Sequence, residues 1–227
     1  MTHPPHSTSH PHPQAPTSDR WEPFEPPGLF GASLGLPAKI WRGAIDGFDS
    51  PAEHKGRVTI GSPAYLILEL KQLDAVMGGK VIPVPRLEAW WGDRPYRFGG
   101  RTVEPRWPFP ADLDGVAALV EKLTGHEFDS CFANHYRDGN DHIPWHADDD
   151  SWIGPVIASV SLGATRRFKL RRKNDHTAVV SGYMAHGDLL LMEAGCQDAW
   201  EHCVPRERTQ RPSPRLNLTF RQTRNPK

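Results

Sequence analysis

The 227-residue sequence predicts a mixed, mainly β fold of the sandwich or jelly-roll kind. From residue 127 onward, short runs rich in β-branched and aromatic residues alternate with polar turns, and helical spacing occurs only upstream. The expected strands are 127–137, 155–162, 165–172, 176–181, 187–193, 199–204 and 214–222.

Two helices are expected before these strands. Ser62 is suited to an N-cap and Pro63 to a first helical turn, and Gly78-Gly79 would end this helix. Its apolar residues recur at helical spacing, at Leu66, Leu70, Leu73 and Met77. The second helix spans 112–123 and would be capped by Gly125. Its apolar side consists of Leu113, Val116, Leu119, Val120 and Leu123.

The N-terminal segment differs in composition from the rest of the chain. Residues 1–27 are rich in His, Pro, Ser and Thr, and they cannot bury enough apolar surface to offset chain entropy. We therefore expect a disordered tail at 1–27 and a single domain over 28–227. Within that domain, 28–110 is an N-terminal extension and 111–227 carries the second helix and the strands.

Composition disfavours several classes of protein. No apolar run reaches the roughly 18 residues of a membrane helix, and the N-terminus lacks the basic start and apolar core of a secretory signal. Three cysteines without Cys-x-x-Cys spacing (Cys131, Cys196, Cys203) favour a reduced, intracellular protein. We expect a cytoplasmic protein, or a nuclear one in a eukaryote, that does not enter membranes, with a monomer as the default.

The most informative motif is His146-Ala147-Asp148, with His202 further along the chain. Side chains alternate faces along a strand, so His146 and Asp148 share a face, and a remote ligand can complete a triangle around one metal. Two His and one carboxylate, with open positions opposite them, suit non-haem Fe(II). A bare His-x-Asp is also common on solvated surfaces.

A zinc pair from His142 and His146 is the rival interpretation, but Pro144 would break the helix that this spacing needs. The surrounding blocks favour iron. They are Asn134-His135-Tyr136-Arg137-Asp138-Gly139, Arg215-Leu216-Asn217-Leu218-Thr219-Phe220-Arg221, Val84-Pro85-Arg86 and Tyr96-Arg97-Phe98-Gly99-Gly100. Together with the His-x-Asp motif they resemble the AlkB family of iron- and 2-oxoglutarate-dependent dioxygenases, in particular its nucleic-acid-repair members, over about residues 60–222.

This resemblance implies a double-stranded β-helix, or jelly roll, with helices packed on one sheet. It implies a site for Fe(II), 2-oxoglutarate and O2, in which His146, Asp148 and His202 bind the iron. 2-Oxoglutarate is a dianion, and an arginine fork binds a carboxylate through two parallel hydrogen bonds. The implied 2-oxoglutarate residues are Asn134, Tyr136, Arg215, Asn217 and Arg221.

The resemblance also implies a nucleic-acid substrate. Alkyl groups would be removed oxidatively from bases such as N1-methyladenine and N3-methylcytosine, in DNA or alternatively RNA, with release of succinate, CO2 and formaldehyde. Residues 28–110 would include the nucleotide-recognition lid. The expected substrate contacts are Arg86, Trp91, Tyr96, Asp149 and Asp150. An oxygenase that acts on a protein or a small molecule is the alternative.

Charge alone does not decide the partner. The 27 basic and 27 acidic residues give a formal net charge of zero, which argues against a strong, charge-driven nucleic-acid binder. Basic residues nevertheless concentrate at 166–173 and 206–224. Such runs are often solvated faces, but beside a site of this kind they favour a basic groove for a phosphate backbone.

Overall fold

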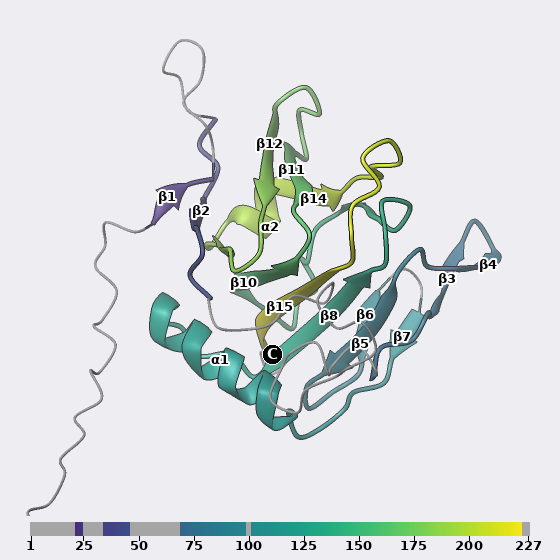
Figure 1. The fold of residues 1–227 in the computed structure, drawn as a ribbon, viewed down its shortest axis with the longest axis horizontal. Helices are drawn as coiled ribbons and strands as arrows, with labels where there is room; N and C mark the ends of the chain where they lie inside the picture. Colours follow the sequence, from purple (N-terminus) through teal and green to yellow (C-terminus); the bar gives the residue numbers. More distant parts are fainter. Residues whose placement is uncertain (1–20, 25–33, 46–68, 99–100, 224–227) are drawn as a thin grey trace, which may run out of the picture.

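The computed structural model describes residues 21–24, 34–45, 69–98 and 101–223. Two antiparallel sheets enclose one core, so the predicted mainly β, jelly-roll class is confirmed (Figure 1). The seven-stranded major sheet has the order β1 (Glu22–Pro23), β2 (Ala38–Trp41), β13 (Leu189–Met192), β10 (Ile153–Gly163), β15 (Arg215–Thr223), β8 (Ser130–Tyr136) and β5 (Leu87–Trp91). The four-stranded minor sheet has the order β12 (Val179–Met184), β11 (Arg166–Arg172), β14 (Trp200–Val204) and β9 (Ile143–His146).

All seven predicted strands are present, and the core lies between the two sheets. Inward residues alternate along each strand, as in β11, where Phe168 and Leu170 are buried. The inner core joins residues of both sheets, including Ile157 and Leu190 from the major sheet. β9 lies outside the predicted set, because its four residues contain a proline and show no alternating pattern.

The predicted second helix is α1 (Ala111–Thr124), which covers the outer face of the major sheet (Figure 1). Leu113, Val116 and Val120 are fully buried there. Gly125 ends the helix with a left-handed φ of 75°, as its position predicted. A second helix of the described residues, α2 (Cys196–Ala199), is a single turn that leads into β14.

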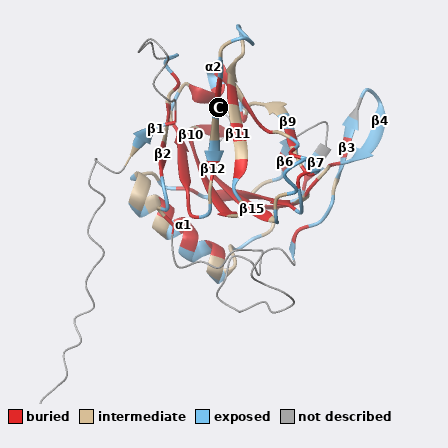
Figure 2. Ribbon diagram, turned by 45° about the horizontal axis from the view of Figure 1, so that its top comes forward, coloured by how far each residue is buried: buried red, intermediate tan, exposed pale blue. Residues whose placement is uncertain are grey.

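The helix predicted over 62–77 is wrong for its described part. β3 (Asp74–Met77) and β4 (Lys80–Pro83) form a hairpin instead, in which Gly78 and Gly79 have φ of 56° and 75°. Two residues of positive φ define the tight turn that matches the twist of paired strands, so Gly-Gly acts here as a hairpin turn and not as a helix end. This hairpin projects from the body of the protein, and β4 is exposed along its length (Figure 2). Residues 62–68 and the Met77 side chain lie outside the description.

The disordered tail predicted through residue 27 is wrong for Trp21–Phe24. β1 pairs with β2, and the Phe24 ring is 4% exposed and meets Phe168 edge-on at 5.8 Å between ring centroids. Two aromatic side chains within four residues supply the apolar area that the neighbouring residues lack. Residues 1–20 are not described. A second hairpin joins β6 (Tyr96–Phe98) to β7 (Arg101–Val103).

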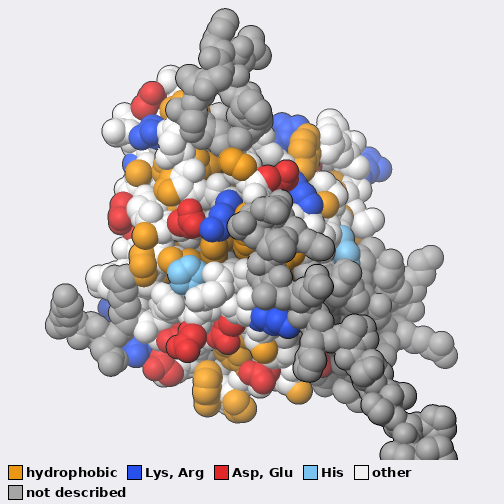
Figure 3. Space-filling view, turned by 90° about the vertical axis from the view of Figure 1, so that its left-hand side faces the viewer, with side chains coloured by type: hydrophobic (Ala, Val, Ile, Leu, Met, Phe, Trp, Pro, Cys, Tyr) orange, Lys and Arg blue, Asp and Glu red, His pale blue; other side chains and the backbone are white. Residues whose placement is uncertain are grey.

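The surface of the described residues carries both signs of charge. On the face seen in Figure 3, basic, acidic and apolar side chains are interspersed. Within the described part of the chain, no helix combines the length and the apolar character needed to cross a membrane.

Candidate active site

The three predicted metal ligands lie together at the inner face of the minor sheet. His146 ends β9 and pairs directly with His202 of β14, with ring centroids 4.2 Å apart. One ligand atom from each of His146, Asp148 and His202 lies within 4.8 Å of the others. The site therefore presents two imidazoles and one carboxylate toward a common point.

Asp148 reaches this point from a loop and not from a strand. β9 ends at His146, and the loop after it is fixed by Gln197 of α2, whose Oε1 accepts the Asp148 N–H at 2.9 Å. Each carboxylate oxygen also accepts one hydrogen bond. Tyr96 OH donates to Oδ1 at 3.1 Å, and Arg221 Nη2 donates to Oδ2 at 2.8 Å. Residues of three other segments, α2, the strand of Tyr96 and β15, thus determine the position of this carboxylate.

The protonation states of the three residues suit a metal. Burial lowers the pKa of His146, and it lowers the pKa of His202 to about 3, so both imidazoles are neutral. Burial opposes ionisation of Asp148, but the charge and the hydrogen bond of Arg221 hold its pKa well below the usual range. Neutral imidazoles and an ionised carboxylate are the ligand forms of these groups.

Ring orientation also fits metal binding. His146 Nδ1 lies 2.9 Å from the carbonyl oxygen of Pro144, so a proton on Nδ1 leaves the Nε2 lone pair for the metal. The His202 ring stacks on Phe168 at 5.4 Å between centroids. With these constraints, the donor set fits Fe(II) with positions left for other ligands.

Next to the three ligands, β15 and β8 supply the predicted 2-oxoglutarate residues. Their antiparallel register pairs Arg215 with Tyr136 and Asn217 with Asn134. All four side chains are buried, and the Arg215 guanidinium lies 5.4 Å from the centre of the Tyr136 ring. The pairing of two strands, and not proximity in the chain, brings these residues together.

Two buried arginine nitrogens in this region have no hydrogen-bond partner. Arg215 donates to Ser161 Oγ at 2.8 Å and to Asn217 Oδ1 at 2.6 Å, but its Nη1 is unpaired, as is Nε of Arg221. A buried, unpaired guanidinium N–H is costly, and an anion that accepts from it removes the cost. The arrangement therefore fits a dicarboxylate between the two arginines.

Two serines of β10, to which the sequence analysis assigned no role, support these residues. Ser159 and Ser161 of β10 lie opposite Thr219 and Asn217 of β15, and Ser159 Oγ donates to Asn217 Oδ1 at 3.0 Å. Two polar residues at alternate positions of an otherwise apolar strand were the available signal. Gln197, by contrast, gave no signal, because its partner Asp148 is 49 residues away.

Arg86 does not face solvent, as a phosphate contact would require. It is 1% exposed, forms an ion pair with Glu88, and donates to Asn134 Oδ1 at 2.8 Å and to the carbonyl oxygen of His142 at 3.2 Å. Its observed contact fixes Asn134, and because Arg86 lines the pocket, its contact with a base stays a prediction.

Trp91 also differs from its predicted substrate role. It lies in the core between the major sheet and α1, on the far side of the sheet from the metal ligands. Trp90, its neighbour on β5, faces the pocket side and contacts Tyr96 at 4.9 Å and Trp152 at 6.0 Å between ring centroids. Strand alternation puts only one of two adjacent tryptophans on that side, and it is Trp90.

The remaining predicted substrate residues lie near the metal ligands. Tyr96 lines the pocket, whereas Asp149 is exposed and paired with Lys173 at 2.7 Å. Asp150 is partly buried, and its pKa is raised by burial and by the charges of Asp148 and Asp149. The rival zinc pair is not formed in the described residues, because 143–146 is a strand and not a helix, and the ligand group around His146 does not include His142.

Comparison with known proteins identifies the family of this chain. The model of the 2OG-Fe(II) oxygenase superfamily matches residues 72–221. The chain belongs to this superfamily. It is 42% identical over 161 residues to mouse alpha-ketoglutarate-dependent dioxygenase alkB homolog 3, covering 66% of this chain and 56% of the relative. It is 40% identical over 154 residues to human DNA oxidative demethylase ALKBH2, covering 63% and 58%.

A more distant relative is Arabidopsis DNA oxidative demethylase ALKBH2, which is 33% identical over 148 residues, covering 54% of this chain and 47% of the relative. The predicted resemblance to the AlkB family is confirmed by these matches. The chain spans about half the length of the curated relatives it matches, between 47% and 58% for these three.

Proposed function

We propose that the protein is an Fe(II)- and 2-oxoglutarate-dependent dioxygenase that removes small alkyl groups from nucleobases. Substrates would be of the N1-methyladenine and N3-methylcytosine type in DNA, and the role would be repair of alkylation damage. The relatives named as DNA oxidative demethylases support this proposal. The observation that carries it is the triad of His146, Asp148 and His202 beside the unpaired guanidinium nitrogens of Arg215 and Arg221.

In this proposal His146, Asp148 and His202 hold the iron, which with O2 and 2-oxoglutarate supplies the oxidant for the alkyl carbon. Arg215 binds the carboxylate remote from the metal, and its contacts with Ser161 and Asn217 fix its fork. Arg221 has a double role. It donates to Asp148, and its unpaired Nε would donate to the second carboxylate of the keto acid.

Tyr136 and Asn134 of β8 line the pocket directly beside the β15 residues, in the same sheet. Burial raises the pKa of Tyr136, so its phenol stays protonated and can donate to a carboxylate. Asn134 is oriented by Arg86, whose Nε donates to Asn134 Oδ1 and leaves the amide N–H2 free to face the pocket. The five residues expected to bind 2-oxoglutarate thus keep that role in the proposal.

Tyr96 and Asp150 are the proposed base contacts. The pKa of the Tyr96 phenol is raised well above its usual value by burial and by Asp148, so this residue is a neutral aromatic wall. A methylated pairing edge carries positive charge, which a carboxylate and an aromatic face favour. Trp152 joins Tyr96 at 5.6 Å between ring centroids and adds a second aromatic surface.

The test uses the purified chain with Fe(II), 2-oxoglutarate, O2 and a single-stranded oligonucleotide that contains one N1-methyladenine. We expect succinate, formaldehyde and the unmodified base in equal amounts. Succinate without base repair would indicate a protein or small-molecule substrate instead. No turnover by iron-loaded protein would contradict the dioxygenase assignment.

A further inference from the structure

The outer face of the minor sheet is basic. On β11, Phe168 and Leu170 point into the core, so strand alternation places Arg167 and Lys169 on the outside. Arg166 begins the same strand but behaves differently. Its side chain is fully buried, forms an ion pair with Glu207 at 3.2 Å and donates to three carbonyl oxygens. The basic run in the sequence thus contains one structural arginine and an outward row of cations.

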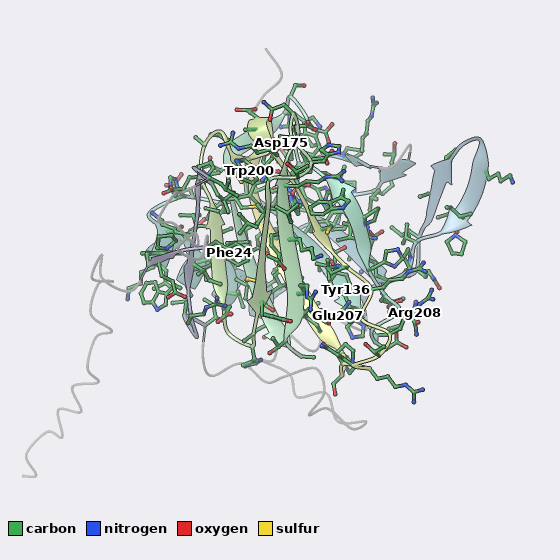
Figure 4. The ribbon with its side chains drawn as sticks, turned by 90° about the horizontal axis from the view of Figure 1, so that it is seen from above. Phe24, Tyr136, Asp175, Trp200, Glu207 and Arg208 are labelled. Atoms are coloured by element: carbon green, nitrogen blue, oxygen red, sulfur yellow. The ribbon has the colours of Figure 1, made fainter. Side chains whose placement is uncertain are left out.

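A groove on this face joins β11 to the loop after β14. Its cations are Arg167, Lys169, Arg206 and Arg208, which we call the basic groove. The one acidic residue that lines it is Glu207, which is 9% exposed. Both of its oxygens are already occupied, one by Arg166 Nε and the other by the backbone N–H of Arg167. In Figure 4, Glu207 lies near Tyr136, and Arg208 lies further toward the outside of the molecule.

The groove cations are not neutralised within the described part of the chain. Arg206 contacts His142, Arg167 donates to the Tyr183 hydroxyl at 3.0 Å, and no described carboxylate forms an ion pair with any of the four. Arg171, two residues after Lys169 on the same strand, differs from these four cations because it forms an ion pair with Glu201 at 2.8 Å. Four unneutralised cations in one hollow favour a polyanionic ligand.

An aromatic side chain borders the same hollow. Tyr183 of β12 lies opposite Arg167 in the sheet and is 45% exposed, with the Arg167 guanidinium 5.5 Å from its ring centre. Exposed aromatic rings among cations are typical of surfaces that bind single strands, where bases stack and phosphates meet the cations. This combination favours a nucleic acid over a simple anion.

The groove and the candidate active site are lined by neighbouring residues of the same two chain segments. Val204 lines the pocket and Arg206 lines the groove two residues later. Phe168, which lies between the groove residues Arg167 and Lys169 on β11, lines the pocket from the other face of the strand. We propose that the basic groove binds the sugar–phosphate backbone of the nucleotides that flank the base held in the pocket. The proposal rests on the proposed function and adds to it a second anchoring site outside the pocket.

The test compares Lys169→Gln/Arg208→Gln with the control Lys71→Gln/Lys122→Gln. The control removes the same charge from two exposed positions, Lys71 before β3 and Lys122 on α1. The probe is a fluorescein-labelled, unmodified 15-nucleotide single strand, and anisotropy is measured from low to high salt. Each lost phosphate contact lowers the slope of log affinity against log salt by about 0.7. We expect a decrease of about 1.4 for the groove variant, and the wild-type slope for the control.

A second readout uses turnover. The groove variant should show a raised KM for a methylated 15-nucleotide strand, with kcat unchanged and with wild-type turnover of 1-methyl-dAMP, which fills the pocket alone. A wild-type salt slope in the groove variant, or an equal loss in the control, would overturn the proposal. If the salt slope of the groove variant decreases as expected but the wild-type protein dealkylates no substrate, the groove proposal stands and the proposed function is refuted.

Discussion

Gln197 offers the sharpest test of how the metal site is held. Its Oε1 accepts the backbone N–H of Asp148 at 2.9 Å, and its Nε2 lies 3.3 Å from the sulfur of Met192. Both Gln197 and Asp148 are buried, at 6% and 4% exposure. Gln197→Met keeps the side-chain volume but leaves the Asp148 N–H buried without an acceptor.

Two magnitudes follow from this contact. An unsatisfied buried N–H costs about 1–3 kcal/mol of stability. Loss of a group that orients a metal ligand typically lowers metal affinity about 10–100-fold. We therefore expect Gln197→Met to unfold at lower urea concentration and to bind Fe(II) at least about tenfold more weakly.

The assay is calorimetric titration of the metal-free protein with Fe(II) under anaerobic conditions, next to urea unfolding of the same samples. Gln72→Met is the matched control, because it removes an exposed glutamine that donates to the carbonyl oxygen of Val84. If Gln197→Met loses stability but binds Fe(II) as tightly as wild type, Gln197 supports the fold only, and our reasoning on Asp148 is refuted.

Three further results are expected. Asp148→Ala should abolish turnover and, by leaving Arg221 buried without its partner, lower stability by about 3–5 kcal/mol in urea unfolding. Arg166→Met should cost a similar amount, about 3–5 kcal/mol, because Glu207 stays buried; an unchanged urea midpoint would contradict this. Burial lowers the pKa of His135 from 6.5 to about 4. Between these two pH values the unfolded chain binds a proton that the folded chain does not, so the free energy of unfolding decreases as the pH falls from 6.5 to about 4. His135→Phe should remove about 3 kcal/mol of the difference in unfolding free energy between pH 7 and pH 4, and an unchanged difference would contradict the assignment.

Much of the site followed from local patterns. The period-two rule placed Asn134 and Tyr136 on one face of β8, and the seven strands were readable because their turns are polar. The pairing of β8 with β15, which the strand pattern does not specify, then brings Tyr136 to Arg215. For this reason the resemblance was needed to group these residues in one pocket.

Other features depend on tertiary contacts and could not be predicted in this way. Trp90 and Trp91 are equivalent in the sequence, and only the pairing of β5 with β8 decides which one faces the pocket. The 62–77 segment has apolar residues at helical spacing, but Gly78-Gly79 closes a hairpin. From the sequence, Arg86 would be expected at the surface. In the structure it is buried, because Glu88, two residues further along, forms an ion pair with it inside the protein.

The central claim is that His146, Asp148 and His202 share one metal ion beside an arginine-bound keto acid. A crystal structure of the protein grown anaerobically with Mn(II) and 2-oxoglutarate tests it most directly. We predict that the ion contacts both imidazoles and the Asp148 carboxylate, and that Arg215 Nη1 donates to the far carboxylate of the ligand. An ion bound elsewhere, or a keto acid with no contact to Arg215, would contradict the account.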